Sequence, residues 1–421
     1  MIIPGRRAHQ PGGPNIFTRR DMATRHILQD LLAPLLFPLS FIYGELSVMR
    51  RAAKESNPVS GPAFFGDPPV PCVSVGNISW GGTGKTPVTA WLLEWAAARG
   101  LHAAVLTRGY RACPPQFPFR VRPDAGVREA GDEPLMLARR YASSTVMVDP
   151  RRSRAAARLM LDAEESGCRP PDMFILDDGF QHISMGRHLD LVLMDADDFE
   201  PGSRSNWNRV IPAGTWREPQ SALTHADAFL IKTTREKWPG LAAAMTSRLA
   251  PFARPVFAFA LQCRGLVYCP PNDELVSENA PPMVSIPAPS PDIPLPEDLA
   301  GPYLLVSGVG NPGLVKETAT AFMGAEPARV ACFPDHHAYT RADAIVLADY
   351  DMPVLCTAKD AVKLSGLGLP RLYALDVEAD FFASLSDSTS TAPGIPFSAW
   401  WGRWWREWQR RSGAACTENT P

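Results

Sequence analysis

A glycine-rich loop between an apolar run and a helical stretch constrains the fold of this 421-residue chain more than any other feature. The run CVSVG (72–76) leads into GNISWGGTGKTP (76–87), and a stretch rich in Ala, Leu and Trp follows it. A GTGKT ending between a strand and a helix is the context that a phosphate-binding P-loop requires. The consensus glycine at position 79 is replaced by Ser79, but the rest of the loop remains rich in glycine.

The residue types of this loop suit nucleotide phosphates. Glycines allow successive backbone N–H groups to point at phosphate oxygens, and the N-terminus of the following helix favours negative charge. Lys85 is expected to reach the β- and γ-phosphates, and Thr86 to bind Mg²⁺. The backbone that cradles the phosphates is expected to come from Gly81, Gly82, Thr83 and Gly84.

Short apolar runs alternate with helical stretches along most of the chain. Runs without strict polar alternation suit strands that are buried on both faces, as in a parallel sheet with crossover helices. We therefore predict an α/β P-loop domain over residues 68–269 and a second, smaller α/β domain over 303–380. The predicted strands are 72–76, 103–107, 145–148, 173–176, 189–194 and 227–232 in the first domain, and 303–308, 329–333 and 353–357 in the second.

The two predicted domains are separated by a proline-rich segment. Residues 270–302 hold ten of the 43 prolines. Proline fixes φ and removes a backbone donor, so we expect an irregular linker with neither strand nor helix.

An apolar segment near the N-terminus raises the question of a membrane. Residues 1–25 are polar and are predicted to be an unstructured extension, whereas 26–50 are predicted to form a membrane-associated helix around the apolar stretch 31–44. That stretch is short for a spanning helix, which needs about 20 apolar residues. A surface helix packed on the body and an export signal remain alternatives, and Pro34 and Pro38 are expected to kink any helix here.

Charge and cysteine content exclude other classes. The 42 Lys and Arg residues against 44 Asp and Glu residues leave a net charge of −2, which argues against a dedicated nucleic-acid binder. The eight cysteines contain no CxxC pair, so neither a zinc site nor a disulfide framework is indicated and a reducing cytosol is expected. No protein partner is evident.

Two adjacent carboxylates are candidates for the metal. Asp177 and Asp178 follow an apolar strand, at the edge where α/β folds build their ligand crevice. One of them is expected to hold Mg²⁺ as a Walker-B aspartate does, although an Asp-Asp turn could also cap a helix. His182 could contact phosphate or simply cap the turn.

A kinase differs from a nucleotide switch by a base near the γ-phosphate. Asp132 and Glu133 in GDEP (131–134) precede a helix, so Asp132 is either the base that accepts a hydroxyl proton or a helix cap. The sequence FPDHH (333–337) follows a strand and could supply a histidine that shares the proton of the base. TAKD (357–360) loosely resembles a guanine-reading motif, but a structural turn is the better explanation. Candidate phosphate-binding arginines are Arg151, Arg152 and Arg217.

Taken together, these motifs resemble the tetraacyldisaccharide 4'-kinase family of lipid A biosynthesis. The resemblance covers about residues 28–370, and DDGFQH (177–182) and PAG-x₂-REP (212–219) are its most specific parts. The other matching motifs are GGTGKTP, TRGY, GDEP, SGVGNP, FPDHH and TAKDAVKL. The proline-rich segment, the N-terminal extension and the C-terminal extension are not recognised features of the family.

The resemblance implies a function and a location. It implies ATP-dependent phosphorylation of the 4'-hydroxyl of a tetraacyl disaccharide 1-phosphate, giving lipid IVA, at the cytoplasmic face of a bacterial inner membrane. The alternative is a P-loop ATPase or GTPase switch at the membrane that does not act on a lipid. The lipid disaccharide, ATP, Mg²⁺ and the membrane surface are the ligands and partners that it implies.

The resemblance also implies roles for particular residues. Asp132 corresponds to the catalytic base, and the histidine that partners it corresponds to His336 or to its neighbour His337. The P-loop Lys85 and Thr86 and the carboxylates Asp177 and Asp178 correspond to the family's nucleotide and metal ligands. The remaining residues at the substrate or phosphates are Glu133, Arg152, His182 and Arg217, with Arg152 preferred to Arg151.

A cluster of tryptophans lies near the C-terminus. If residues 397–413 form a helix, its five tryptophans fall within an arc of about 140°, with three arginines opposite. Our hypothesis is an amphipathic helix that lies in the membrane interface. The alternative is a terminal helix that packs its tryptophans on the second domain.

Overall fold

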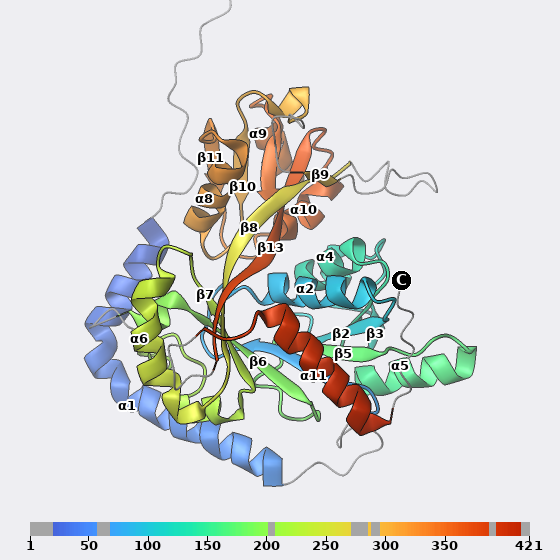
Figure 1. Cartoon of the computed structure of the whole chain (residues 1–421). Coiled ribbons are helices and arrows are strands. Elements are labelled where there is room, and N and C mark those ends of the chain that lie inside the picture. The colour runs from blue at the N-terminus through green and yellow to red at the C-terminus, as the bar shows by residue number, and fades with distance from the viewer. Residues whose placement is uncertain are drawn as a thin grey trace, which may run out of the picture.

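The computed structural model describes residues 20–56, 68–200, 207–270, 285–287, 295–386 and 393–413. Residues 1–19 of the predicted extension and most of the proline-rich segment lie outside this part of the chain. Figure 1 shows a larger domain carrying the P-loop, a smaller domain above it, and helices near both ends of the chain that lie against the larger domain.

One sheet runs through both domains. Within the described residues its order is β11-β10-β12-β13-β8-β7-β6-β1-β5-β2-β4-β3, and β9 pairs with β8. The strands of the larger domain are β1 (Cys72–Asn77), β2 (Ala103–Thr107), β3 (Phe119–Arg120), β4 (Thr145–Val148), β5 (Met173–Asp177), β6 (Leu189–Asp195), β7 (Ala228–Lys232) and β8 (Val256–Tyr268). The remaining strands are β9 (Ser285–Pro287), β10 (Leu304–Ser307), β11 (Arg329–Cys332), β12 (Val354–Thr357) and β13 (Leu372–Leu385).

Helices connect and cover these strands. In the larger domain they are α2 (Lys85–Ala97), α3 (Val127–Ala130), α4 (Asp132–Arg140), α5 (Arg152–Ser166) and α6 (Trp238–Leu249). The smaller domain has α8 (Pro312–Met323), α9 (Arg341–Ala348) and α10 (Ala358–Leu364). The short 3₁₀ turns are η1 (Ala196–Phe199), η3 (Gln220–His225), η4 (Ala250–Phe252), η5 (Glu297–Leu299) and η6 (Ser365–Leu367), and the terminal helices are α1 (Arg20–Ser56) and α11 (Phe397–Ser412).

The predicted α/β fold class is confirmed, and the buried faces explain why the strand sequences do not alternate with polar residues. In β6, Leu191 and Leu193 pack toward α2 and α4, whereas Val192 and Met194 pack toward α6. Both faces of the central strands are therefore buried, as parallel sheets require. All nine predicted strands lie within or overlap observed strands.

The connection between the domains differs from the prediction. Strands β8 and β13 form a long antiparallel pair, from Tyr373 opposite Tyr268 to Leu385 opposite Val256, that passes from the smaller domain into the larger one (Figure 1). The chain therefore returns to the larger domain, and residues 270–302 are not the sole link. Inside that segment β9 pairs with β8 and η5 forms a 3₁₀ turn, so the expectation of neither strand nor helix was wrong.

Ion pairs connect strands β8 and β13 to two helices, α2, which begins at the P-loop, and α4, which begins in GDEP. Arg264 of β8 donates to both carboxylate oxygens of Glu94 in α2, at 2.6 and 2.9 Å, and to Asp376 of β13 at 2.9 Å. Arg140, at the end of α4, also pairs with Asp376. The buried carboxylate of Asp376 is therefore compensated, as a buried charge must be.

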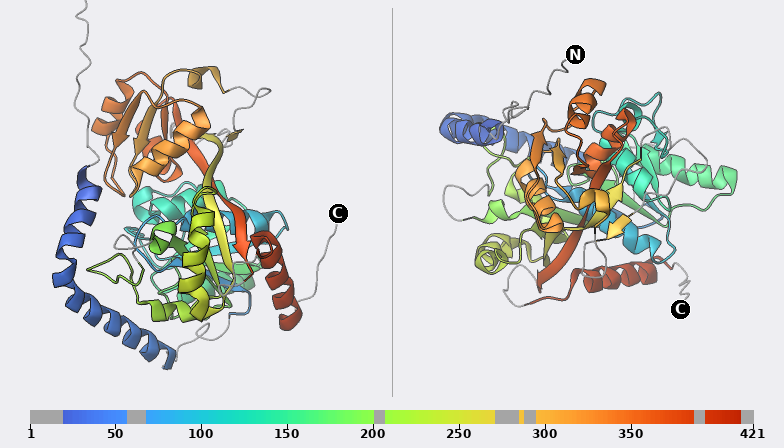
Figure 2. Two further views of the ribbon diagram at one scale, coloured as in Figure 1. Left: turned by 60° about the vertical axis from the view of Figure 1, so that its left-hand side comes forward. Right: turned by 90° about the horizontal axis from the view of Figure 1, so that it is seen from above.

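Helix α1 is longer than the predicted 26–50, and it is bent near its middle (Figure 2), with Pro34 and Pro38 inside it. Arg51 anchors it through a bidentate pair with Glu218 at 2.7 and 3.2 Å, and Ser40 Oγ accepts from the Ala213 amide at 2.9 Å. The side that faces the body has mostly small or polar residues, whereas large apolar residues are exposed: Leu32, Leu35, Phe37, Leu39, Phe41, Ile42, Leu46 and Met49.

Helix α11 contradicts the interfacial hypothesis for the tryptophan cluster. Trp401 is fully buried and Trp405 nearly so, and both pack edge-on against Trp95 of α2, with ring centroids 5.4 and 5.2 Å away. The alternative of a terminal helix that packs its tryptophans on the protein is confirmed, but the domain was wrong, because α11 covers the larger domain, on the side away from α1 (Figure 2). An amphipathic pattern cannot distinguish a headgroup layer from an apolar protein surface.

We expect replacement of Trp401 by Ala to lower the free energy of unfolding by about 3–5 kcal/mol, because it leaves a large cavity between α11 and α2. Denaturant unfolding measures this effect, and Arg403→Ala on the exposed side of α11 is the matched control. Vesicle binding should be the same for both variants. Unchanged stability together with weaker vesicle binding would restore the interfacial hypothesis.

Candidate active site

The phosphate loop joins β1 to α2, and hydrogen bonds with Asn77, the last residue of β1, hold it in place. Lys85 Nζ donates to Asn77 Oδ1 at 3.3 Å, and Asn77 Nδ2 donates to Thr83 Oγ1 at 2.9 Å. Gly84 has φ +90°, and a Cβ there would lie 2.8 Å from the ring of Phe259. The GTGKT segment therefore has the strand–loop–helix setting expected of it, with Lys85 and Thr86 in the first turn of α2.

The two metal candidates lie beside this loop and differ in their surroundings. Asp178 receives two hydrogen bonds from Arg217, at 2.8 and 2.9 Å, and lies 3.6 Å from Lys85 Nζ. Although burial acts in the opposite direction, Lys85 and Arg217 hold the pKa of Asp178 below its ordinary value. Burial and the charges of Glu133 and Asp178 raise the pKa of Asp177 to about 6.

These donors suit Mg²⁺. Asp177, Asp178 and the hydroxyl of Thr86 offer hard oxygen ligands, which Mg²⁺ prefers. Burial of the Asp177 carboxylate, together with the charges of Glu133 and Asp178, raises its pKa, and a bound cation would stabilise the ionised form. Thr107 Oγ1 donates to Asp177 Oδ2 at 2.9 Å and so fixes the carboxylate.

A basic group that includes Arg152 interacts electrostatically with these carboxylates. Arg152 Nη1 lies 3.4 Å from His182 Nδ1, and the opposite nitrogen of His182 lies 3.0 Å from Ser184 Oγ. Burial and the nearby charges of Arg152, Lys54, Arg187 and Arg108 lower the pKa of His182 to about 3. His182 is thus neutral beside a cluster of cations, which is suited to an anionic ligand.

The acid pair of GDEP meets the smaller domain. Asp132 Oδ2 lies 2.9 Å from His336 Nδ1, across 204 residues of sequence. Burial tends to raise the pKa of Asp132, but the hydrogen bond with His336 and the charges of Lys359 and Lys363 outweigh it, and the pKa lies below its ordinary value. Asp132 is therefore an ionised, oriented carboxylate.

His337 does not share this position. Its ring stacks on Phe333 at 4.7 Å and its Nε2 lies 3.3 Å from Asp343. His336 has a positive φ of 60°, and its ring lies beside that of Tyr110 at 5.2 Å. The geometry thus singles out His336 as the neighbour of Asp132.

The sequence reasoning missed two lysines of TAKDAVKL. Lys359 Nζ lies 3.3 Å from Glu133, 3.2 Å from Asp335 and 3.1 Å from His336 Nε2. Lys363 Nζ lies 3.7 Å from Asp132. Their spacing of four residues places them on one face of a helix, which was the available signal.

TAKD has a structural role in the fold. Asp360 is buried, accepts from the amide of Gly308 at 2.9 Å and from Thr357 Oγ1 at 2.8 Å, and so ties α10 to the loop after β10. A buried carboxylate with these hydrogen bonds is not available to bind a guanine base. TAKD was the sequence motif that suggested a GTPase switch, so this alternative loses that support.

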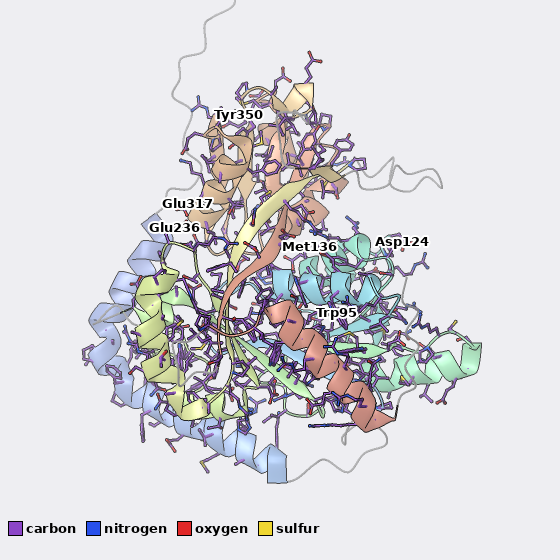
Figure 3. All side chains as sticks on the ribbon, in the orientation of Figure 1. Trp95, Asp124, Met136, Glu236, Glu317 and Tyr350 are labelled. Atoms are coloured by element: carbon purple, nitrogen blue, oxygen red, sulfur yellow. The ribbon has the colours of Figure 1, made fainter. Side chains whose placement is uncertain are left out.

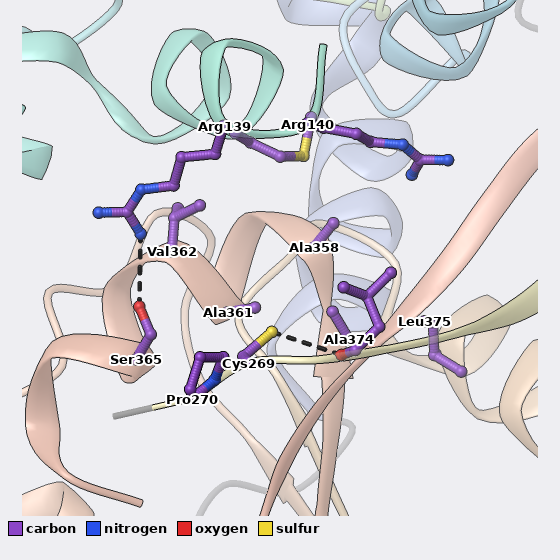
Figure 4. Close-up of a pocket in the computed structure, with 12 residues that line it drawn as sticks. Arg139, Arg140, Cys269, Pro270, Ala358, Ala361, Val362, Ser365, Ala374 and Leu375 are labelled. Atoms are coloured by element: carbon purple, nitrogen blue, oxygen red, sulfur yellow. Dashed lines mark hydrogen bonds between the residues drawn. The ribbon is translucent and has the colours of Figure 1, made fainter. Parts of the chain in front are cut away.

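A small apolar cavity of about 50 Å³ lies between α4 and α10 (Figure 4). Arg139 Nη1 donates to Ser365 Oγ at its edge, at 3.4 Å. Burial raises the pKa of the lining Cys269 thiol to about 12, so it is not a nucleophile. The cavity belongs to the packing between the domains.

The fold and the site together define a P-loop kinase: a phosphate loop, oxygen donors for a metal and an ionised carboxylate converge at the carboxyl edge of a parallel sheet. The family model for tetraacyldisaccharide-1-P 4'-kinase (LpxK) matches residues 32–391. This chain belongs to that family.

Individual relatives agree with this assignment. The tetraacyldisaccharide 4'-kinase of Oleidesulfovibrio alaskensis is 43% identical over 377 residues, which cover 89% of this chain and 96% of the relative. That of Nitratidesulfovibrio vulgaris is 44% identical over 374 residues, covering 89% and 94%. The fold is similar to that of a solved structure, the crystal structure of Aquifex aeolicus LpxK in complex with ATP, with a TM-score of 0.60 at 24% identity, covering 83% of this chain and 95% of that chain.

Proposed function

We propose that this kinase transfers the γ-phosphoryl group of ATP to the 4'-hydroxyl of a tetraacyl disaccharide 1-phosphate. The description of its family states this substrate class, and the names of its relatives state a tetraacyldisaccharide. The observation that carries the proposal is the contact of Asp132 with His336 at the domain boundary. The charge of Glu133, the residue after Asp132, is one cause of the raised pKa of Asp177, which supports a single site that includes both acid pairs.

Asp132 is the proposed general base. Its carboxylate accepts the proton of the sugar hydroxyl as the oxygen attacks phosphorus. His336 orients the carboxylate from the smaller domain, and Lys359 holds both His336 and Glu133 in position.

The phosphates are the proposed ligands of the loop and its cations. Backbone N–H groups of residues 81–84, with Lys85 and Arg217, would neutralise charge that builds up on the phosphoryl oxygens. Thr86, Asp177 and Asp178 would hold Mg²⁺, which would supply further neutralisation of phosphate charge. Asp178 already engages Lys85 and Arg217, so these cations are held together before a nucleotide arrives.

The lipid acceptor is the proposed ligand of the basic group that includes Arg152 and His182. Arg152 lies 3.4 Å from the neutral His182 and interacts electrostatically with Asp177 and Asp178. A sugar phosphate would gain charge-assisted hydrogen bonds there.

Helix α1 supports a place at the membrane. The part of α1 from Leu32 to Lys54 is long and apolar enough to cross a bilayer. Only 17% of its most apolar 18-residue stretch is buried inside the protein. The apolar side points away from the body, whereas Arg51 pins the other side beside Phe180 of DDGFQH. An acylated substrate held in the cytoplasmic leaflet of the inner membrane would thus lie close to the proposed acceptor site.

Incubation of the purified protein with radiolabelled ATP, Mg²⁺ and a synthetic tetraacyl disaccharide 1-phosphate tests the function. We expect label on the 4'-hydroxyl and none when that hydroxyl is blocked. Hydrolysis of ATP without transfer would instead support a switch.

We expect the double substitution Leu35→Asp and Phe41→Asp to lower co-sedimentation with anionic vesicles at least several-fold, since it places charge on the exposed apolar side of α1. Leu161→Asp, at an exposed position of α5, is the matched control. Undiminished binding of the double variant would contradict a membrane role for α1.

A further inference from the structure

The outer side of the phosphate loop has little packing support. Gly81 and Gly82 are exposed, and a Cβ at either position would meet no heavy atom within 4 Å. Glycines in such an open setting retain much conformational freedom, and fixing them when a ligand binds costs entropy. Polar contacts from other segments therefore have to define the shape of the loop there.

Two such contacts come from distant parts of the chain. The amide of Trp80 donates to the carbonyl of Thr215 at 2.8 Å, at the entrance of the loop. At its crest, Lys232 Nζ donates to the carbonyl of Gly82 at 2.6 Å. The N–H of the same peptide unit, that of Thr83, donates to Gly81 O at 3.0 Å, so both polar atoms of this peptide are held.

The topology of the sheet brings Lys232 to this point. It is the last residue of β7 and pairs in register with Asp195, the last residue of β6. Asp195 Oδ2 lies 2.5 Å from Lys232 Nζ. The side chain of Lys232 is only 15% exposed, and its ammonium group contacts both of these oxygens.

We propose that Lys232, oriented by Asp195, is a positioning residue that preorganises the phosphate loop for ATP. The inference rests on the proposed function, because it assumes that the loop binds ATP. Lys232 acts through the backbone of the loop, whereas Lys85 acts on the phosphates themselves. Preorganisation lowers the cost of binding, and a charged donor makes a stronger hydrogen bond than a neutral one.

Lys232→Met in the full-length protein tests this role, because it keeps the alkyl chain and removes the donor. We expect Kd and KM for Mg-ATP to rise about tenfold, with kcat and the KM for the lipid acceptor within about threefold of wild type. Lys232→Arg should recover most of the ATP affinity. Asp195→Asn, which retains the bond to Gly82, should raise Kd less than Lys232→Met does. Lys237→Met, five residues later and exposed, is the matched control and should bind ATP as wild type does.

Calorimetry with Mg-ATP separates the outcomes. If wild type and Lys232→Met bind ATP equally well, the positioning role is overturned and the proposed function stands. If Lys232→Met weakens ATP and acceptor binding alike and lowers Tm, and Lys232→Arg does not rescue it, the role is structural and the inference is again overturned. If the wild-type protein binds no ATP, both the inference and the proposed function fall.

Discussion

Replacement of Asp132 by Asn is expected to lower kcat about 10²–10⁴-fold, the range that a positioned general base contributes. The amide has the same shape but cannot accept the hydroxyl proton. ATP affinity should remain within about threefold of wild type, because Asp132 contacts His336 and lies near Lys363, and neither residue is in the phosphate loop. Single-turnover transfer to the lipid acceptor, with ATP binding followed by calorimetry, measures both quantities.

The matched control is Asp124→Asn, eight residues earlier, where an exposed carboxylate pairs with Arg122 (Figure 3). This control should retain wild-type activity. If Asp132→Asn transfers phosphate as fast as wild type does, Asp132 is only the first residue of α4 and the assignment of the base is wrong.

The same variant should show a pH-dependent change in stability. A carboxyl pKa below its ordinary value stabilises the folded state above the unfolded-state pKa of about 3.9. That stabilisation is lost as the pH falls through the lower folded-state pKa. The difference in unfolding free energy between wild type and Asp132→Asn should therefore narrow on acidification.

The second large effect is expected at Lys85. We expect Lys85→Met to lower kcat/KM for ATP about 10³-fold or more, because it removes a preorganised charge from the position where the transferred phosphoryl group gains charge. It also leaves Asp178 with Arg217 as its close cationic partner, at 2.8 Å. Steady-state kinetics with saturating lipid acceptor measures this loss.

Lys85→Arg separates charge from geometry. The guanidinium group keeps the charge but differs in shape and donor geometry, so we expect it to recover little of the lost activity. Lys316→Met, on α8 of the smaller domain, is the control for loss of a lysine elsewhere. Wild-type kinetics for Lys85→Met would contradict the assignment of the phosphate loop.

The extent to which the site could be predicted depended on how local each signal is. Lys85 and Thr86 could be predicted, because the strand, loop and helix are continuous in sequence and their geometry depends on neighbouring residues. Asp177 and Asp178 follow from the end of a buried strand. Lys359 was missed because its contacts with Glu133 and His336 exist only when the smaller domain meets α4.

The linker and the tail illustrate the same difference. Proline content indicated an irregular connector, but β9 still pairs with β8 because a partner edge is available in three dimensions. The tryptophans of α11 formed an amphipathic face whose partner could be lipid or protein. Trp95 of α2 supplied the apolar surface, and the predicted membrane contact was wrong.

The sequence by itself determined the α/β class, the strands and the phosphate loop, because buried runs and glycine-rich turns depend on the residues next to them. The tertiary structure alone decided that β8 and β13 join the domains, that His336 meets Asp132 and that Lys232 reaches Gly82. The contacts of His336 with Asp132 and of Lys232 with Gly82 join residues 204 and 150 positions apart, and the pairing of β8 with β13 is set by the order of strands in the sheet. A local sequence pattern does not predict such pairings, since they depend on the free energy of the whole packed chain.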